Sequence, residues 1–146
     1  MSELKFEAVN ILVIDDEPFM RQLIIRVLAE LGITRIDTAE DGADGMGKLT
    51  IVRHPYDVII CDLEMPVMNG LQFVKRLRQM ERTDLAQIPV LIVTGHSDEK
   101  NVQNAIKLGI QGFLIKPISK AAMEKRLTIA LTGKDPGEEG GGEGAG

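Results

Sequence analysis

Five short apolar runs, separated by segments with helical spacing, restrict the folds open to this chain more than any other feature of the sequence. The runs cover residues 11–14, 35–39, 58–61, 90–93 and 113–115, of which 35–39 is the weakest. Their lengths and β-branched content are typical of strands, and apolar residues at successive positions indicate burial on both faces. Strands that alternate with helices form a parallel sheet covered on both sides, so the sequence predicts an α/β fold.

The segments between the runs carry signals for helix starts and helix ends. After the first run, an apolar residue recurs at every fourth position, at Phe19, Leu23, Val27 and Leu31, with Ile24 and Leu28 beside this stripe. We expect the stripe to face the sheet, with Pro18 near the start of the helix and Gly32 at its end. Further helices are expected over about 41–53, after Asn69-Gly70, from Ser97 or Asp98 to Gly109, and from Ser119 to Gly133.

Length, charge and cysteine content narrow the class of protein. A chain of 146 residues fits one domain. The 17 basic and 22 acidic residues give a net charge of −5, which disfavours direct binding to DNA because such binding needs a cationic surface. The single cysteine, Cys61, is expected to be a small buried apolar residue of a reduced protein. The start of the chain does not resemble a signal peptide, and no apolar run approaches the ~18 residues of a membrane span, so we expect a cytoplasmic protein without membrane insertion.

The last residues differ in composition from the rest of the chain. From Gly133 the sequence reads GKDPGEEGGGEGAG, which contains seven of the fifteen glycines and no large apolar residue. Such a segment buries too little surface to offset the entropy cost of ordering. We therefore expect a folded domain over 1–132 and a disordered tail or linker over 133–146. The alternative interpretation is that the tail is an acidic segment that attracts a basic partner.

Charged and polar side chains stand directly after four of the five runs. Asp15-Asp16 follow the first run, Asp62 the third, Thr94 the fourth and Lys116-Pro117 the fifth. In an open parallel sheet, ligands bind beyond the carboxyl ends of the strands, near the point where the strand order reverses. If the order is 2-1-3-4-5, these four strand ends are neighbours, and one surface holds three carboxylates, a hydroxyl and an ammonium group.

The three carboxylates indicate a metal and a phosphoryl acceptor. At close range they repel one another, so at neutral pH they must share protons or hold a cation. Mg²⁺ binds carboxylates, water and phosphate oxygens, and it fits this set. A carboxylate is a competent nucleophile toward phosphorus and forms an aspartyl phosphate, while metal, Lys and Thr stabilise the charge on the transferring oxygens. Because a carboxylate has no proton to remove, no catalytic histidine is needed.

The whole pattern resembles the receiver domain of response regulators in two-component systems. Its parts are Asp15-Asp16, Asp62 followed by Met65-Pro66 and Asn69-Gly70, Thr94-Gly95, and Lys116-Pro117, over about residues 10–131. The resemblance implies a flavodoxin-like (βα)₅ fold with a five-stranded parallel sheet in order 2-1-3-4-5. For the site, it implies Asp62 as phosphoacceptor, Asp15, Asp16 and the Glu64 backbone carbonyl as further Mg²⁺ ligands, Lys116 as the phosphate-pairing cation, and Thr94 with Phe113 as the switch.

Some positions have both a functional and a plain interpretation. Glu64 and His96 each lie two residues beyond a site residue, where side chains in the family tune the lifetime of the phosphate; both are otherwise solvated loop residues. Phe113 stands where the family often has Tyr, and it offers no hydroxyl to a partner. The family commonly has a cis peptide at the position of Lys116-Pro117.

The resemblance implies a signalling switch that catalyses only its own phosphorylation and dephosphorylation. A sensor histidine kinase or a histidine phosphotransfer protein would phosphorylate Asp62, and the face built by the fourth helix, fifth strand and fifth helix would change for a downstream protein. The segment Phe19-Met20-Arg21 resembles stand-alone, chemotaxis-type regulators.

Three other functions compete with this one. A Mg²⁺-dependent phosphatase with an aspartyl-phosphate intermediate would carry Asp-x-Asp after the first strand, where this chain has Asp15-Asp-Glu-Pro18. A flavin-type carrier would have a hydroxyl- and Gly-rich first loop to bind its phosphate. A phosphorylation-independent interaction module would not need the complete set of site residues.

Overall fold

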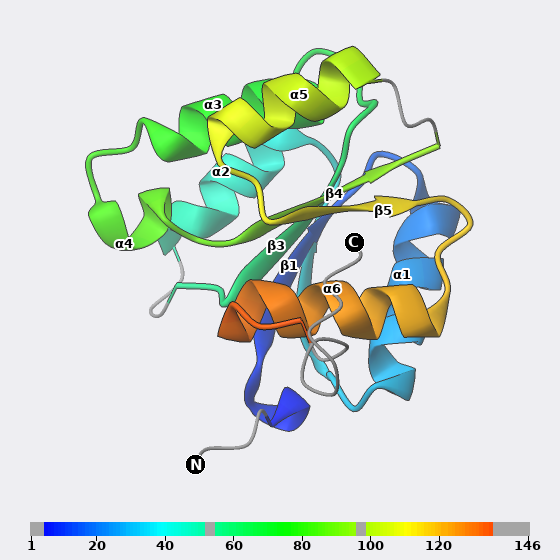
Figure 1. Ribbon diagram of the computed structural model, residues 1–146. Coiled ribbons are helices and arrows are strands. Elements are labelled where there is room, and N and C mark those ends of the chain that lie inside the picture. Colours follow the sequence, from blue (N-terminus) through cyan, green and yellow to red (C-terminus); the bar gives the residue numbers. More distant parts are fainter. Residues whose placement is uncertain (1–4, 52–54, 96–98, 136–146) are drawn as a thin grey trace.

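The five strands form one parallel sheet in a computed structural model that describes residues 5–51, 55–95 and 99–135. They are β1 (Asn10–Ile14), β2 (Arg35–Ala39), β3 (Val58–Asp62), β4 (Val90–Thr94) and β5 (Gly112–Ile115). Their order across the sheet is β2-β1-β3-β4-β5 (Figure 1), and each neighbouring pair is parallel. The predicted α/β class, flavodoxin-like topology and strand order are confirmed.

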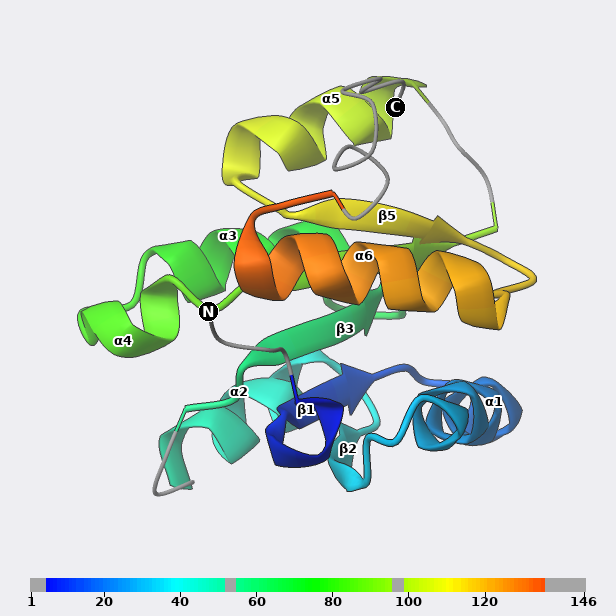
Figure 2. The ribbon, with the colours of Figure 1, turned by 60° about the horizontal axis from the view of Figure 1, so that its bottom comes forward.

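Helices cover both faces of this sheet. As Figures 1 and 2 show, α1 (Pro18–Glu30) and α6 (Lys120–Thr132) lie on one face, and α2 (Gly42–Ile51), α3 (Gly70–Arg78) and α5 (Glu99–Leu108) lie on the other. Two short helices, η1 (Phe6–Ala8) and α4 (Thr83–Ala86), were not predicted. Because α4 precedes β4, the predicted fourth helix is α5 and the predicted fifth helix is α6. The predicted start of the fourth helix, at Ser97 or Asp98, lies outside the described residues.

Each face of the sheet packs against a buried apolar core. β3 and β4 are buried at every position, as their unbroken apolar sequences indicate. The helices contribute Ile24, Val27, Leu28, Met123 and Leu127 to one core and Leu49, Phe73, Val74 and Leu77 to the other. The sheet is therefore held from both sides, and only its edges and strand ends are free for function.

The apolar stripe predicted to face the sheet from α1 is wrong at its first residue, Phe19. Phe19 is 79% exposed, whereas Ile24 and Leu28 are buried. Phe19 lies five residues before Ile24, which places it about 140° away around the helix. The buried face of α1 is centred on the residues that we had placed beside the stripe.

The starts of α3 and α6 fix the ends of the two loops that follow β3 and β5 at the carboxyl edge of the sheet. Asn69 begins α3 with a capping box: the Gln72 N–H donates to Asn69 Oδ1, and the Asn69 N–H donates to Gln72 Oε1, each at 2.8 Å. Ser119 begins α6, where its Oγ accepts the Ala122 N–H at 3.1 Å. These caps fix where the loops after β3 and β5 end, and both loops leave the edge that carries the acidic residues.

Candidate functional site

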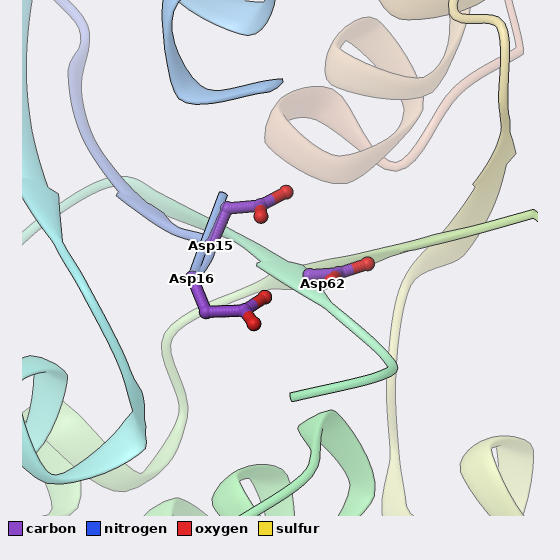
Figure 3. Close-up of side chains that lie close together, drawn as sticks. All are labelled: Asp15, Asp16 and Asp62. Atoms are coloured by element: carbon purple, nitrogen blue, oxygen red, sulfur yellow. The ribbon is translucent and has the colours of Figure 1, made fainter. Parts of the chain in front are cut away.

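The side chains predicted for the site meet at the carboxyl edge of the sheet. Asp62 and Thr94 are the last residues of β3 and β4, Asp15 and Asp16 directly follow β1, and Lys116 directly follows β5. The four strands that carry them are neighbours in the sheet. Figure 3 shows the carboxylates of Asp15, Asp16 and Asp62 turned to the same side of this edge.

Asp15 is fixed by the loop that follows β1. The residue is fully buried, and its Oδ1 accepts the Glu17 N–H at 2.9 Å. Its own N–H donates to the Ala39 carbonyl at 3.2 Å, and its carbonyl accepts a hydrogen bond from Arg21 Nη1 at 2.6 Å. The second carboxylate oxygen, Oδ2, is buried and has no hydrogen-bond partner among the described residues. Burial raises the pKa of Asp15 above its ordinary value, although the hydrogen bond from Glu17 opposes this shift.

Asp62 forms an ion pair with Lys116 inside the same space. Asp62 is 3% exposed, and Lys116 Nζ lies 3.3 Å from its Oδ1. Burial, followed by the charge of Asp15, raises the pKa of Asp62 to about 6, although Lys116 acts in the other direction. Burial by itself lowers the pKa of Lys116, but the neighbouring carboxylates, chiefly that of Asp62 and also those of Asp15 and Glu17, together outweigh this effect and the pKa is raised. Lys116 is therefore a protonated, positively charged neighbour of Asp62 at neutral pH.

The acidic cluster of Asp15, Asp16 and Asp62 can hold a divalent cation. One carboxylate oxygen of each residue lies within 4.8 Å of the other two. Asp15 Oδ2 and Asp62 Oδ1 are buried without a hydrogen bond from any described residue, which is costly for a carboxylate. Oxygen-rich, negatively charged sites of this kind suit hard cations such as Mg²⁺. The residues present therefore fit a metal ion.

Two residues take part in the site that were not predicted to have a role there. Arg21 binds the carbonyl of Asp15. Gly70 starts α3 against the backbone of β3, where an added Cβ would lie 2.6 Å from the Asp62 carbonyl oxygen. Gly70 belonged to the motif that we used, and its lack of a side chain is what permits this approach. Arg21 belonged to the segment that resembles chemotaxis-type regulators, but its contact at the site could not be predicted, because its partner is a backbone atom.

Both the sequence and the structure match known proteins. The family model of the response regulator receiver domain matches residues 11–128. The chain belongs to this family. Receiver domains are phosphorylation-dependent signalling switches, so this receiver is one too, and the phosphatase and the phosphorylation-independent module are not favoured.

Chemotaxis regulators are among the relatives of this receiver. It is 32% identical over 126 residues to the chemotaxis protein CheY1 of Helicobacter pylori, covering 86% of this chain and 99% of the relative. The chemotaxis protein CheY-3 of Vibrio cholerae is 29% identical over 118 residues, which are 81% of this chain and 88% of the relative. The solved structure of Vibrio cholerae CheY4 has a TM-score of 0.75 at 32% identity, covering 84% of this chain and 98% of that one.

The other predicted residues of the receiver lie around the acidic cluster or outside the described part. Thr94 is 1% exposed, and its carbonyl accepts the Lys116 N–H at 2.9 Å. Phe113 is partly buried against the core on the α3–α5 face, and Glu64 is exposed. The Lys116–Pro117 peptide is cis, as the resemblance implied. His96 lies outside the described residues.

Two plainer expectations can also be compared with the structure. Cys61 is fully buried in β3, next to Asp62, as expected for a small apolar residue. No helix in the described part of the chain has the length and apolar content needed to span a bilayer.

Proposed function

We propose that Asp62 is the phosphoacceptor of this receiver and that it takes its phosphoryl group from a histidine kinase or a histidine phosphotransfer protein. The observation that carries the proposal is the buried Asp62 carboxylate, which faces Lys116 at 3.3 Å and shares its space with two further carboxylates. Neither Asp15 nor Asp16 is positioned in this way against a cation, because the described ion pair of the site is the one between Lys116 and Asp62.

In the transfer step, an oxygen of the Asp62 carboxylate attacks the phosphorus of a phosphohistidine. The new bond is an O–P bond, the P–N bond breaks, and its electron pair stays on the leaving imidazole. The carboxylate has no proton to lose, so no general base takes part. The Lys116 ammonium stabilises negative charge on the phosphoryl oxygens, and the Thr94 hydroxyl, at the end of the neighbouring strand, is the second group that we assign to them.

Mg²⁺ is the cofactor that we assign to the acidic cluster. Asp15, Asp16, Asp62 and the backbone carbonyl of Glu64 would hold it. When bound, the ion neutralises carboxylate charge and provides positive charge for phosphoryl oxygens. We further assign Glu64 and His96 to tuning the lifetime of the phosphate, since each lies two residues beyond a site residue.

The output surface that we propose is the face of α5, β5 and α6. Phosphorylation adds charge next to Thr94, and Thr94 and Phe113 then act as the switch. Ile106 of α5 and Ile115 of β5 are exposed large apolar residues on these elements, as a protein-binding face requires. Because two of the relatives are chemotaxis proteins, a chemotaxis-type protein target is the proposed partner, without direct binding to DNA.

The proposal extends to the organisation of the chain. We assign residues 1–132 to the receiver domain and 133–146 to a Gly/Glu-rich tail or linker. The protein would act in the cytoplasm, where kinases of this class present their phosphohistidine, and it would turn over no substrate other than its own phosphate.

Phosphoryl transfer to the purified chain tests the proposal. Radiolabelled acetyl phosphate, or a labelled histidine kinase, should label the wild type in Mg²⁺, and excess EDTA should abolish labelling until Mg²⁺ is restored. Asp62→Asn should accept no label, whereas Asp84→Asn, which removes an exposed carboxylate on α4, should be labelled like the wild type. Stable labelling of Asp62→Asn would overturn the site assignment, and undiminished labelling in EDTA would overturn the metal assignment.

A further inference from the structure

A hollowed surface extends from the loop before α3 across this helix to α5. It consists of two hollows of about 390 and 410 Å³, and both are lined by Gln72 and Lys75. One extends to Val67 at the start of the surface, and the other extends to Leu108 of α5. We call the lining of these two hollows the α3 surface. Because the hollows share residues, one ligand could occupy both.

Val67 is the most unusual residue of the α3 surface. It is fully exposed, and its φ of +69° is the single positive φ among the described non-glycine residues. The Met68 N–H donates to the Pro66 carbonyl at 2.7 Å, which closes a three-residue turn around Val67. A turn of this kind with positive φ at its centre is rare and strained, and a β-branched residue is poorly suited to it.

The local structure gives no reason for a valine at this position. Asn or Gly would adopt the same backbone conformation with less strain, and the Val67 side chain gains nothing from burial in the free protein. Strained residues cluster at sites where their side chain has a function. A contact with another molecule would use both features of Val67, its apolar side chain and its full exposure.

The charges of the α3 surface give the chemistry of that molecule. Although the chain has a net charge of −5, the charged residues that line the two hollows are all basic: Lys75, Arg76 and Lys107. None of the three forms an ion pair with a residue in the described part of the chain. Between these cations lie the partly buried apolar side chains of Met68, Leu71 and Leu108.

From this combination, we propose that the α3 surface docks a protein partner through an acidic segment that also carries apolar side chains. The apolar groups would contact Val67 and the floor of the hollows, and the carboxylates would pair with Lys75, Arg76 and Lys107. This site goes beyond the proposed output face of α5, β5 and α6, because most of its lining lies on α3 and in the loop before it, although Asn104, Lys107 and Leu108 belong to α5.

Defined peptides test the docking site on the full chain. The probes are an amphipathic Leu/Glu helix of about 15 residues, its Leu/Lys counterpart, and a peptide with the sequence of residues 136–146 of this chain. Binding is followed by fluorescence anisotropy and by chemical-shift changes. The Leu/Glu peptide should bind saturably and shift Val67, Leu71, Lys75 and Lys107, and the Leu/Lys peptide should not bind.

Two sets of variants separate docking from a structural role. Lys75→Glu with Lys107→Glu should weaken binding of the Leu/Glu peptide at least tenfold. The matched control, Lys120→Glu with Lys134→Glu, makes the same change of charge elsewhere and should leave the affinity unchanged. Val67→Asn should weaken peptide binding severalfold while the thermal midpoint stays equal or rises, because the backbone strain is relieved. Phosphorylation of Asp62 should be normal in all of these variants.

Several outcomes would overturn the proposal. Absence of saturable binding by the Leu/Glu peptide, or shifts that map outside the α3 surface, would show that no such site exists. Tighter binding of the 136–146 peptide would identify the tail of this chain as the occupant. A concentration-dependent dimer that is lost on Lys75→Glu, seen by analytical ultracentrifugation, would identify a second copy. Loss of labelling in Asp62→Asn tests the phosphoacceptor separately and has no bearing on this surface.

Discussion

At the carboxyl ends of the strands, Asp15 Oδ2 and Asp62 Oδ1 are buried and accept no hydrogen bond from any described residue. The part-buried polar groups near the amino ends, in contrast, are paired. There, the Tyr56 hydroxyl donates to Asp37 Oδ2 at 2.6 Å. Arg78 donates to three backbone carbonyls at 2.7–2.9 Å. The Val90 N–H donates to Gln111 Oε1 at 2.7 Å. The same sheet therefore has one end with buried carboxylate oxygens that lack hydrogen bonds and one end where the polar groups are hydrogen-bonded.

This difference separates the part of the molecule that binds ligands from the part that stabilises the fold. Burial of carboxylate oxygens that accept no hydrogen bond lowers stability even where, as at Asp62, a lysine lies nearby. Their retention at one edge is understandable where a cation and a phosphoryl group supply further partners. The paired groups near the amino ends join elements that are distant in sequence, and they offset this cost. Three substitutions, one of them also followed as a function of pH, test whether stability and function are divided in this way.

The largest effect is expected for Arg78→Ala near the amino ends. Arg78 Nη1 donates to the carbonyls of Ala86 and Ile88, and Nη2 donates to the carbonyl of Gly109, so one side chain joins α3 to the starts of β4 and β5. Its removal leaves three carbonyls without a donor, and we expect a loss of about 3 kcal/mol in the free energy of unfolding. Arg76→Ala, on the same helix, is the control and should cost less than about 0.5 kcal/mol. Urea denaturation measures both; equal losses would mean that the Arg78 contacts add nothing.

An increase in stability is expected for Asp62→Asn at the carboxyl end. At pH 7 without divalent cations, wild-type Asp62 is ionised although its pKa is raised to about 6, so the folded state bears the cost of that charge. The amide removes it, and we expect a gain of about 1–2 kcal/mol, discounted because Lys116 loses its partner. Mg²⁺ should then stabilise the wild type and not the variant. A loss of stability in Asp62→Asn would show that the ion pair outweighs burial.

The pH dependence of this gain sharpens the comparison further. The folded-state pKa of Asp62, about 6, lies above its ordinary value of 3.8, so the folded state binds the proton more tightly than the unfolded state. Wild-type stability should therefore fall, relative to Asp62→Asn, as the pH rises from about 4 to about 6. The gain of the variant should be close to zero at pH 4 and complete at pH 7. Denaturation of both proteins in EDTA at several pH values checks this, and a gain independent of pH would exclude titration of Asp62 as its cause.

The fold and the acidic cluster could be predicted because both depend on short sequence patterns. Runs of buried residues identified the strands, and residues directly after them, such as Asp62 and Lys116, had to lie at one edge once the strands were parallel. Pairs of residues that are distant in sequence could not be predicted in the same way. Arg78 binds carbonyls, which every residue possesses, so its partners leave no trace in the sequence. The exposure of Phe19 was missed because spacing alone does not select the buried face of a helix.

The smallest effect is expected for Tyr56→Phe, which tests whether pairing near the amino ends depends on single contacts. The change removes the hydroxyl that donates to Asp37 and keeps the buried ring. Because Asp37 is exposed, water can replace the lost donor, and we expect a loss of about 1 kcal/mol. Tyr56→Phe should leave labelling of Asp62 unchanged, and its effect on stability should add to that of Asp62→Asn in the double variant, since the two sites share no partner. A non-additive double variant would show that the two ends of the sheet are coupled, and the division between a binding end and a stabilising end would fail.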